Sequence, residues 1–333
     1  MTTTFDPTAL PAPPELMMFL LWLTMFVHFS MLGLLFAGLW ARAGAEWGKS
    51  NRYDIERVHR ASVVGYSMTI TMGIPPLLFV QVLYGRFFYS SSISIGYPWL
   101  AIVGYLMVGF YALYLARMQW DRAGGPSLLG KLSWGLTILS VSAIGSTYSW
   151  NHLKSLSETP WLQQVAAAEV PHRLLGYFGA ILMSSGAWAL WLGKSWCTDK
   201  ETPRGSAWAL MIGGLALLAW APTSTYASCS QCAPAKLLSL VGSGLGIAAG
   251  VIHLLKERSI LTRWLASAAG LVGLAGLIMQ RETYRLEVLA PYYSPLAVPI
   301  RTQWSAVALF AVTLLAGIAT LLWLLTRIRR ASG

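Results

Sequence analysis

LMMFLLWLTMFVHFSMLGLLFAGLW, residues 16–40, is an uninterrupted apolar run without a charged side chain. The hydrocarbon core of a bilayer is about 30 Å thick, and an α-helix needs about 20 apolar residues to cross it. This run therefore predicts a transmembrane helix. Eight similar runs follow it, at about residues 61–85, 98–116, 131–150, 173–193, 205–224, 237–255, 264–280 and 304–326.

The composition of the whole chain agrees with a membrane protein. Charged residues make up 11% of the 333 residues, against about 25% in soluble domains, and the mean hydropathy is +0.56. These values exclude a soluble enzyme. The runs are continuously apolar rather than alternating, which excludes a transmembrane β-barrel. We therefore expect an all-α, polytopic transmembrane bundle of about nine spans, a single integral-membrane domain over residues 1–333 in contact with the lipid bilayer.

The lysines and arginines between these runs are unequally distributed. Of the 24, 17 fall on one side of the predicted bundle. Because cytoplasmic loops carry the excess of Lys and Arg, we predict that the N-terminus lies outside and the C-terminus in the cytoplasm of a multi-pass protein in the bacterial inner (cytoplasmic) membrane. The cations are spread over several loops rather than gathered in one patch, which argues against nucleic-acid binding.

The predicted membrane interior carries very few ionisable groups. All 13 carboxylates fall in loops or at the ends of runs, and only His28 lies near mid-depth. Ion-coupled transporters usually need a buried charge on their pathway, so this pattern argues against that class. Pro75-Pro76 nevertheless predicts a break in the second run that would expose backbone carbonyls. A transporter with a midplane site at this break therefore remains an alternative, while a packing kink is the simpler interpretation.

Histidines are the candidate ligands for haem b. A membrane haem needs two histidines at equal depth on facing helices. By depth, His152 matches His172 near the outer rim and His59 matches His253 near the inner rim, so either pair is a candidate. An interfacial hydrogen-bonding role is the simpler interpretation of both pairs. His28 has no partner at its depth; it is a further candidate ligand, or a donor to a carbonyl of a neighbouring helix.

The cysteines are too few for a disulfide scaffold or an iron–sulfur cluster, and no metal site is predicted. Cys229-Ser-Gln-Cys232 lies in the outer loop between the sixth and seventh runs, and Ala233 follows it where a haem-c attachment motif requires His. In an oxidising compartment this spacing predicts a small disulfide loop, with a redox-active dithiol as the alternative. Cys197 is expected to remain a thiol on the cytoplasmic side.

Two shorter patterns predict local structure. Thr159-Pro160-Trp161 combines a helix N-cap with proline at the first helical position, which predicts a short interfacial helix. Small-residue stripes in the seventh and eighth runs predict that these two helices pack closely on each other. The stripes are Gly242, Gly246 and Gly250, and Gly270, Gly273 and Gly276.

The richest group of polar residues is predicted at the outer rim. A quinone headgroup needs hydrogen-bond donors to its two carbonyls, a proton acceptor and an apolar route for its tail. We expect His172 or His152 to accept the quinol proton and Glu282 to relay it. Tyr284 and Gln81 would hold the carbonyl oxygens, and Arg281 and Arg285 would set the potential. The predicted quinone-binding residues are Gln81, Tyr84, Gln280, Arg281, Tyr284 and Arg285. An aromatic and arginine belt at the headgroups is the alternative.

Two stretches carry a resemblance to a known family. HRASVVGYSMTITMGIPPLLFVQVLYGRFFYSSS, residues 59–92, and QRETYRLEVLAPYYSPLAVPIRTQW, residues 280–304, together with the His28 helix, resemble a poorly characterised bacterial family of multi-span membrane proteins associated with c-type cytochromes. The resemblance implies an electron-transfer membrane subunit that binds quinone or haem b.

These patterns together predict a membrane subunit of a respiratory electron-transfer complex. It would exchange electrons between membrane quinone and a periplasmic c-type cytochrome or iron–sulfur subunit, in association with other membrane subunits. Such a subunit of a quinol oxidoreductase would not be catalytically complete alone. The alternatives are the transporter and a non-redox structural anchor subunit.

Overall fold

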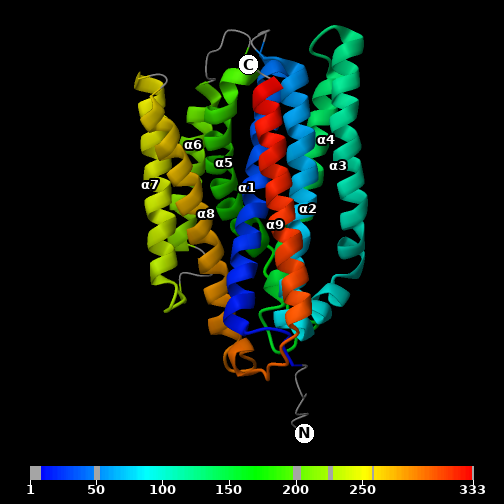
Figure 1. The fold of residues 1–333 in the computed structure, drawn as a ribbon, viewed down its shortest axis with the longest axis vertical. Helices are drawn as coiled ribbons and strands as arrows, with labels where there is room; N and C mark the ends of the chain where they lie inside the picture. The colour runs from blue at the N-terminus through cyan, green and yellow to red at the C-terminus, as the bar shows by residue number, and fades with distance from the viewer. Residues whose placement is uncertain (1–8, 49–52, 198–203, 224–227, 257–258, 332–333) are drawn as a thin grey trace.

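The computed structural model describes residues 9–48, 53–197, 204–223, 228–256 and 259–331, and within these ranges the fold is all-α (Figure 1). The helices are α1 (Pro14–Trp47), α2 (Ile55–Ser94), α3 (Gly96–Ala123), α4 (Leu128–Lys154), α5 (Glu169–Trp196), α6 (Arg204–Thr223), α7 (Ala233–Lys256), α8 (Ile260–Leu289) and α9 (Trp304–Ala331), with a 3-10 turn, η2 (Pro295–Ala297), before the last.

Eight of these helices, α1 to α8, are long and apolar enough to cross a membrane. The chain is therefore a multi-pass membrane protein, as its composition predicts. A helix also occupies the ninth predicted position, but the apolar part of α9 that the structure describes, Trp304–Thr320, is shorter than the other eight. Several helices extend beyond the predicted runs, because helical hydrogen bonding continues through the amphipathic turns at the ends of each apolar stretch.

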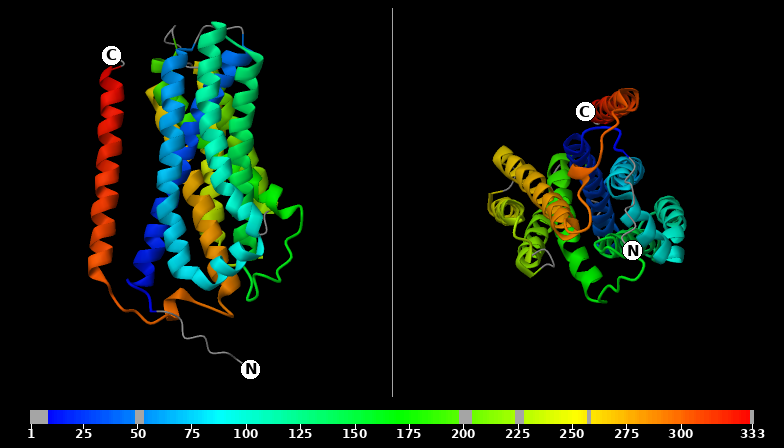
Figure 2. Two further views of the ribbon diagram at one scale, coloured as in Figure 1. Left: turned by 90° about the vertical axis from the view of Figure 1, so that its right-hand side faces the viewer. Right: turned by 90° about the horizontal axis from the view of Figure 1, so that it is seen from below.

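The helices lie side by side along the long axis of the molecule, with α1 and α5 in the middle and α7 and α3 at opposite edges (Figure 1). Consecutive helices pack in pairs, and α5 also packs on α1 and α8. In contrast, α9 stands to one side of the bundle (Figure 2). Phe310 of α9 packs on Phe79 of α2, with ring centroids 5.0 Å apart.

The N-terminal segment helps to hold α9 in place. Leu10 pairs with Ile300 in an isolated bridge, in which the Leu10 N–H donates to the Pro299 carbonyl at 2.8 Å and the Leu10 carbonyl accepts from the Arg301 N–H at 2.8 Å. The side chain of Leu10 is buried. These contacts attach the start of α9 to the segment that precedes α1.

The predicted break at Pro75-Pro76 is wrong. α2 continues through both prolines, and its single residue with non-helical dihedral angles is Tyr84, at φ −132° and ψ 29°. Proline fixes φ near the helical value and removes one hydrogen bond, which a long helix packed on its neighbours tolerates. The helix break on which a midplane site at Pro75-Pro76 depended is therefore absent. The kink in α2 lies instead at Tyr84, nearer the end of the helix.

The glycine stripes serve more interfaces than predicted. A Cβ atom on Gly242 of α7 would lie 2.5 Å from the backbone nitrogen of Gly273 in α8, so these two helices do pack backbone to backbone. A Cβ atom on Gly246 would meet Met183 of α5, and one on Gly250 would meet Met211 of α6. One stripe on α7 thus contacts three different helices, because α5, α6 and α8 each reach its small-residue face.

The interfacial helix predicted at Thr159 does not form. Residues 155–168 make turns and irregular backbone between α4 and α5, including a turn in which the Leu162 N–H donates to the Thr159 carbonyl at 2.9 Å. Trp161 and Leu162 are both exposed. A short helix is unstable unless one of its faces packs on something, and the rest of the protein leaves these two side chains largely exposed.

Candidate functional site

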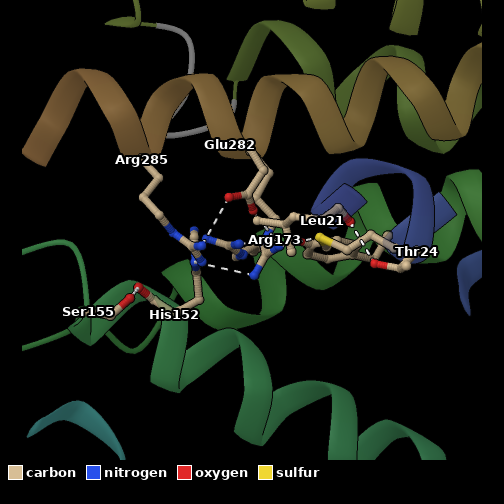
Figure 3. Close-up of polar contacts among 10 residues, drawn as sticks. Leu21, Thr24, His152, Ser155, Arg173, Glu282 and Arg285 are labelled. Atoms are coloured by element: carbon tan, nitrogen blue, oxygen red, sulfur yellow. Dashed lines mark hydrogen bonds and ion pairs between the residues drawn. The ribbon is translucent and has the colours of Figure 1, made fainter. Parts of the chain in front are cut away.

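The helices α2, α4 and α8 end at the lower end of the bundle in Figure 1. Charged and aromatic side chains of these three helices contact one another. We define the Arg285 cluster as Tyr84 of α2, His152 of α4, and Arg281, Glu282 and Arg285 of α8. Figure 3 shows His152, Glu282 and Arg285 converging from two helices, with Arg173 of α5 beside them. All of these side chains lie inside the bundle rather than in a surface belt.

Glu282 is the carboxylate of the cluster. It is 1% exposed and accepts from Arg281 Nη1 at 2.6 Å and from Arg285 Nη1 at 3.0 Å. The spacing of three residues places Glu282 and Arg285 on the same face of α8. Two guanidinium groups therefore share one carboxylate. Together the three side chains carry a net positive charge.

The protonation of His152 follows from its contacts. Its side chain is 3% exposed, and Nδ1 is contacted by Arg285 Nη2 and, at 3.4 Å, by Arg281 Nη2. A guanidinium group only donates, so Nδ1 must accept and carry no proton. The imidazole is therefore neutral, with its proton on Nε2. This Nε2–H is buried and has no hydrogen-bond partner among the described residues.

Tyr84 joins the cluster because of the kink in α2. Its ring lies beneath the guanidinium of Arg285, 4.7 Å from Cζ to the ring centroid, within the range of a cation–π interaction. At the kink the Leu83 carbonyl accepts from the Tyr293 hydroxyl at 2.6 Å. Burial raises the pKa of Tyr293, so this hydroxyl stays a donor. Tyr293, which sequence reasoning missed, thus supports the backbone that positions Tyr84.

Two further helices contribute to the surroundings of the cluster. Arg281 Nη1 lies 2.9 Å from Met25 Sδ of α1, and Arg173 Nη2 of α5 donates to the Tyr177 hydroxyl at 2.9 Å. Sequence reasoning placed Arg173 in the same rim region without assigning it a role. Met25 has no distinguishing signal, because it lies in a continuously apolar run.

The other predicted quinone residues have varied surroundings. Gln280 is fully buried, and its backbone carbonyl oxygen lies 3.7 Å from Cys232 Sγ. Gln81 is half-buried, and its side chain makes no hydrogen bond within the described part of the chain. Tyr284 is half-buried and packs with Tyr177 against the core of α5, α6 and α8. His172 is half-buried on α5.

The two predicted haem pairs have different surroundings in the structure. His59 of α2 packs on Tyr114 of α3, whereas His253 is on α7, across the bundle (Figures 1 and 2). The inner-rim pair is therefore not on facing helices. His152 accepts at Nδ1 from two arginines and carries its proton on Nε2, so this tautomer leaves no free ring nitrogen for iron, and a haem between His152 and His172 stays a prediction. His28 donates from Nδ1 to the Thr69 carbonyl of α2 at 2.9 Å, as its second interpretation predicts.

The predicted disulfide is present. Cys229 and Cys232 are joined, with Cα atoms 5.4 Å apart. Glu287 of α8 holds the loop by accepting from the backbone N–H groups of Ser230 and Gln231, each at 3.1 Å. Cys197 is outside this disulfide and is buried, so it is less accessible than a loop thiol.

A second buried ion pair lies toward the other end of α1, where sequence reasoning placed only interfacial charges. Arg42 Nη2 donates to Glu46 Oε1 at 2.5 Å and to the Ala116 carbonyl of α3 at 2.8 Å. Glu46 Oε2 accepts from the Ser127 N–H at the start of α4, at 3.2 Å. This pair connects α1, α3 and α4, which is a structural role.

No family model matches this chain, and no curated protein and no solved structure is detectably similar to it. The resemblance to a cytochrome-associated family stays a prediction.

Proposed function

We propose that the protein is a membrane subunit of a respiratory electron-transfer complex and that it binds the headgroup of membrane quinone at the Arg285 cluster. The observation that carries this proposal is a set of buried hydrogen-bond donors, drawn from separate helices, at one end of an otherwise apolar bundle. Quinone binding requires this combination, because the headgroup has two carbonyl acceptors and the tail must stay in the bilayer.

The proposal includes the orientation of the chain. Nine spans, with α9 as the ninth, place the N-terminus outside and the C-terminus in the cytoplasm of the bacterial inner membrane, in agreement with the distribution of Lys and Arg. The Arg285 cluster then faces the periplasm. A periplasmic c-type cytochrome or iron–sulfur subunit would exchange electrons with the quinone there, and other membrane subunits would complete the complex.

The chemistry assigned to each residue follows from its contacts. The Nε2–H of His152 would donate to a quinone carbonyl, in place of the proton-accepting role expected from sequence. Arg281 and Arg285 provide positive charge in a low-dielectric interior, where such charge acts strongly on an electron added to the ring. Glu282 is the carboxylate in contact with both arginines and would pass protons outward. Four further residues remain predicted to contact the quinone headgroup: His172, Gln81, Gln280 and Tyr284.

The test is quinol-dependent reduction of a c-type cytochrome by membranes that contain the assembled complex. His152→Gln and Arg285→Ala should each lower the turnover by about 10²-fold or more, in the range typical of a lost positioned group. His59→Gln is the matched control, because this histidine packs on Tyr114 of α3 and lies near the opposite end of α2 from Tyr84. Direct quinone binding is measured with the purified protein by quenching of its tryptophan fluorescence.

Unchanged turnover in both variants, with normal amounts of protein in the membrane, would remove quinone chemistry from the cluster. Failure of the wild-type protein to bind quinone would refute the proposed function as a whole. The non-redox anchor would then be the better description.

A further inference from the structure

We propose that the Arg285 cluster stabilises the anionic semiquinone, with His152 Nε2–H as the donor to one semiquinone oxygen. This inference rests on the proposed function, since it specifies which redox form of the quinone the site binds. It is based on the direction of the hydrogen bonds at His152 and on the charge of the groups around it.

The unpartnered donors of the cluster determine which ligands the site can bind. Within the Arg285 cluster, two buried donors have no hydrogen-bond partner among the described residues, His152 Nε2–H and Arg285 Nε–H, and both side chains are at most 3% exposed. A buried donor without an acceptor is unfavourable by about 1–3 kcal/mol. The matching ligand therefore presents an acceptor oxygen, as a quinone carbonyl or an oxyanion does.

The second step excludes quinol as the preferred ligand. A quinol hydroxyl must donate its hydrogen to an acceptor, and His152 Nδ1 already accepts from Arg285 and Arg281. Each oxygen of Glu282 already accepts from one of the same two arginines. The donors of the site thus outnumber its acceptors, and each acceptor named here already takes at least one hydrogen bond from an arginine, so the site favours the oxidised and anionic forms over the protonated one.

The third step is electrostatic. Arg281 and Arg285 together carry two positive charges against the single negative charge of Glu282, and Arg173 lies beside them (Figure 3). In a buried site, charges interact several times more strongly than in water. A negative charge on the bound ring is therefore stabilised, whereas neutral quinone and neutral quinol gain little.

The relevant equilibrium needs no outside reductant. One quinone and one quinol give two semiquinone anions and two protons: one electron passes from quinol to quinone, and the two O–H bonds of quinol break. Selective binding of the anion shifts this equilibrium toward the radical. Since protons are released, the yield should rise with pH while the cluster remains folded.

The same donors would also suit a phosphate oxygen, and a phospholipid headgroup at this end of the bundle is the competing source. The distinction is that a lipid phosphate is not paramagnetic and gives no radical. The experiment therefore detects the radical and also determines which bound lipids accompany the purified protein.

The experiment uses the purified full-length chain with equal amounts of a short-chain quinone and its quinol, one benzoquinone and one naphthoquinone in turn. Electron paramagnetic resonance should show a semiquinone, and pulsed measurements should show coupling to a histidine nitrogen that changes when the protein is labelled with ¹⁵N-histidine. His152→Phe should remove this coupling and lower the radical yield about tenfold or more, as expected when a hydrogen bond to a charged group is lost. His59→Gln, near the opposite end of α2 from Tyr84, should retain both.

The outcomes separate the two proposals. Absence of quinone binding by the wild-type chain overturns the proposed function. Quinone binding and turnover without a radical, or a radical without histidine coupling, overturns only the present inference, and the labelled wild-type protein decides this even if His152→Phe fails to fold. A tightly bound anionic phospholipid that quinone does not displace, and that His152→Phe loses, would also overturn it and assign the donors to lipid.

Discussion

The guanidinium of Arg285 lies 4.7 Å above the ring of Tyr84, although the two residues are far apart in the sequence and on different helices. This contact exists because α2 leaves helical geometry at Tyr84 itself. On its other side, the same guanidinium contacts Glu282 and His152. One kink in α2 therefore completes a site whose charged residues come mainly from α8.

The buried carboxylate should be the most sensitive residue of the cluster. Glu282→Gln leaves two buried guanidinium groups without their counter-charge, which typically lowers the free energy of unfolding by about 3–5 kcal/mol. Thermal unfolding in detergent should show a clear loss of stability. Glu56→Gln is the matched control, because Glu56 pairs with Arg60 at an exposed position where such pairs contribute about 0–1 kcal/mol. Equal effects of the two variants would contradict the burial argument.

The hydroxyl of Tyr293 should stabilise the kink. Tyr293→Phe removes the hydrogen bond to the Leu83 carbonyl, and we expect the free energy of unfolding to fall by about 1 kcal/mol. Tyr292→Phe, at the exposed neighbouring residue, should have no measurable effect. Thermal unfolding of the two variants in the same detergent provides the comparison, and a stable Tyr293→Phe protein would show that the kink does not depend on this bond.

Two glycines on α7 should respond oppositely to the same substitution. A Cβ atom on Gly242 would lie 2.5 Å from the Gly273 nitrogen, whereas one on Gly244 would have no neighbour within 4 Å. Gly242→Ala should therefore separate α7 from α8 and reduce the amount of folded protein. Gly244→Ala should be tolerated or slightly stabilising, because alanine has the higher helix propensity. Similar yields of both variants would argue against backbone-to-backbone packing at Gly242.

Thiol labelling should distinguish the three cysteines. Cys229 and Cys232 should react only after reduction, because they form a disulfide. Cys197 should react slowly until the protein is unfolded, because it is buried. Mass spectrometry of labelled peptides before and after reduction and denaturation gives this order directly. Rapid labelling of Cys229 and Cys232 in unreduced protein would mean that the loop is open in the membrane.

The proposed orientation predicts opposite locations for two reporters. A reporter fused after Gly333 should be active in the cytoplasm, and one inserted between Ser228 and Lys236 should be active in the periplasm. The physical basis is the excess of Lys and Arg on the side assigned to the cytoplasm. If both reporters indicate the same compartment, the number of spans between these positions differs from the proposed three.

The class of the fold could be derived from the sequence because it depends on local composition. A run such as residues 16–40 must form a helix in a bilayer whatever surrounds it, since the backbone has no other way to satisfy its hydrogen bonds there. The disulfide between Cys229 and Cys232 was predictable for a similar reason: the two residues are three positions apart. All five residues of the Arg285 cluster were also predicted as site residues, because polar residues are conspicuous at the ends of apolar runs.

Only the tertiary structure decided how these residues meet. Arg281 contacts Met25 and Arg285 contacts His152 across separations of 256 and 133 residues, and such contacts depend on how helices pack, which apolar periodicity alone does not specify. The kink at Tyr84, rather than at Pro75-Pro76, depends equally on packing, since Tyr293 supports the bent backbone from another segment. The tautomer of His152 follows from the same arrangement. Two guanidinium groups contact Nδ1, so the proton of the ring must lie on Nε2.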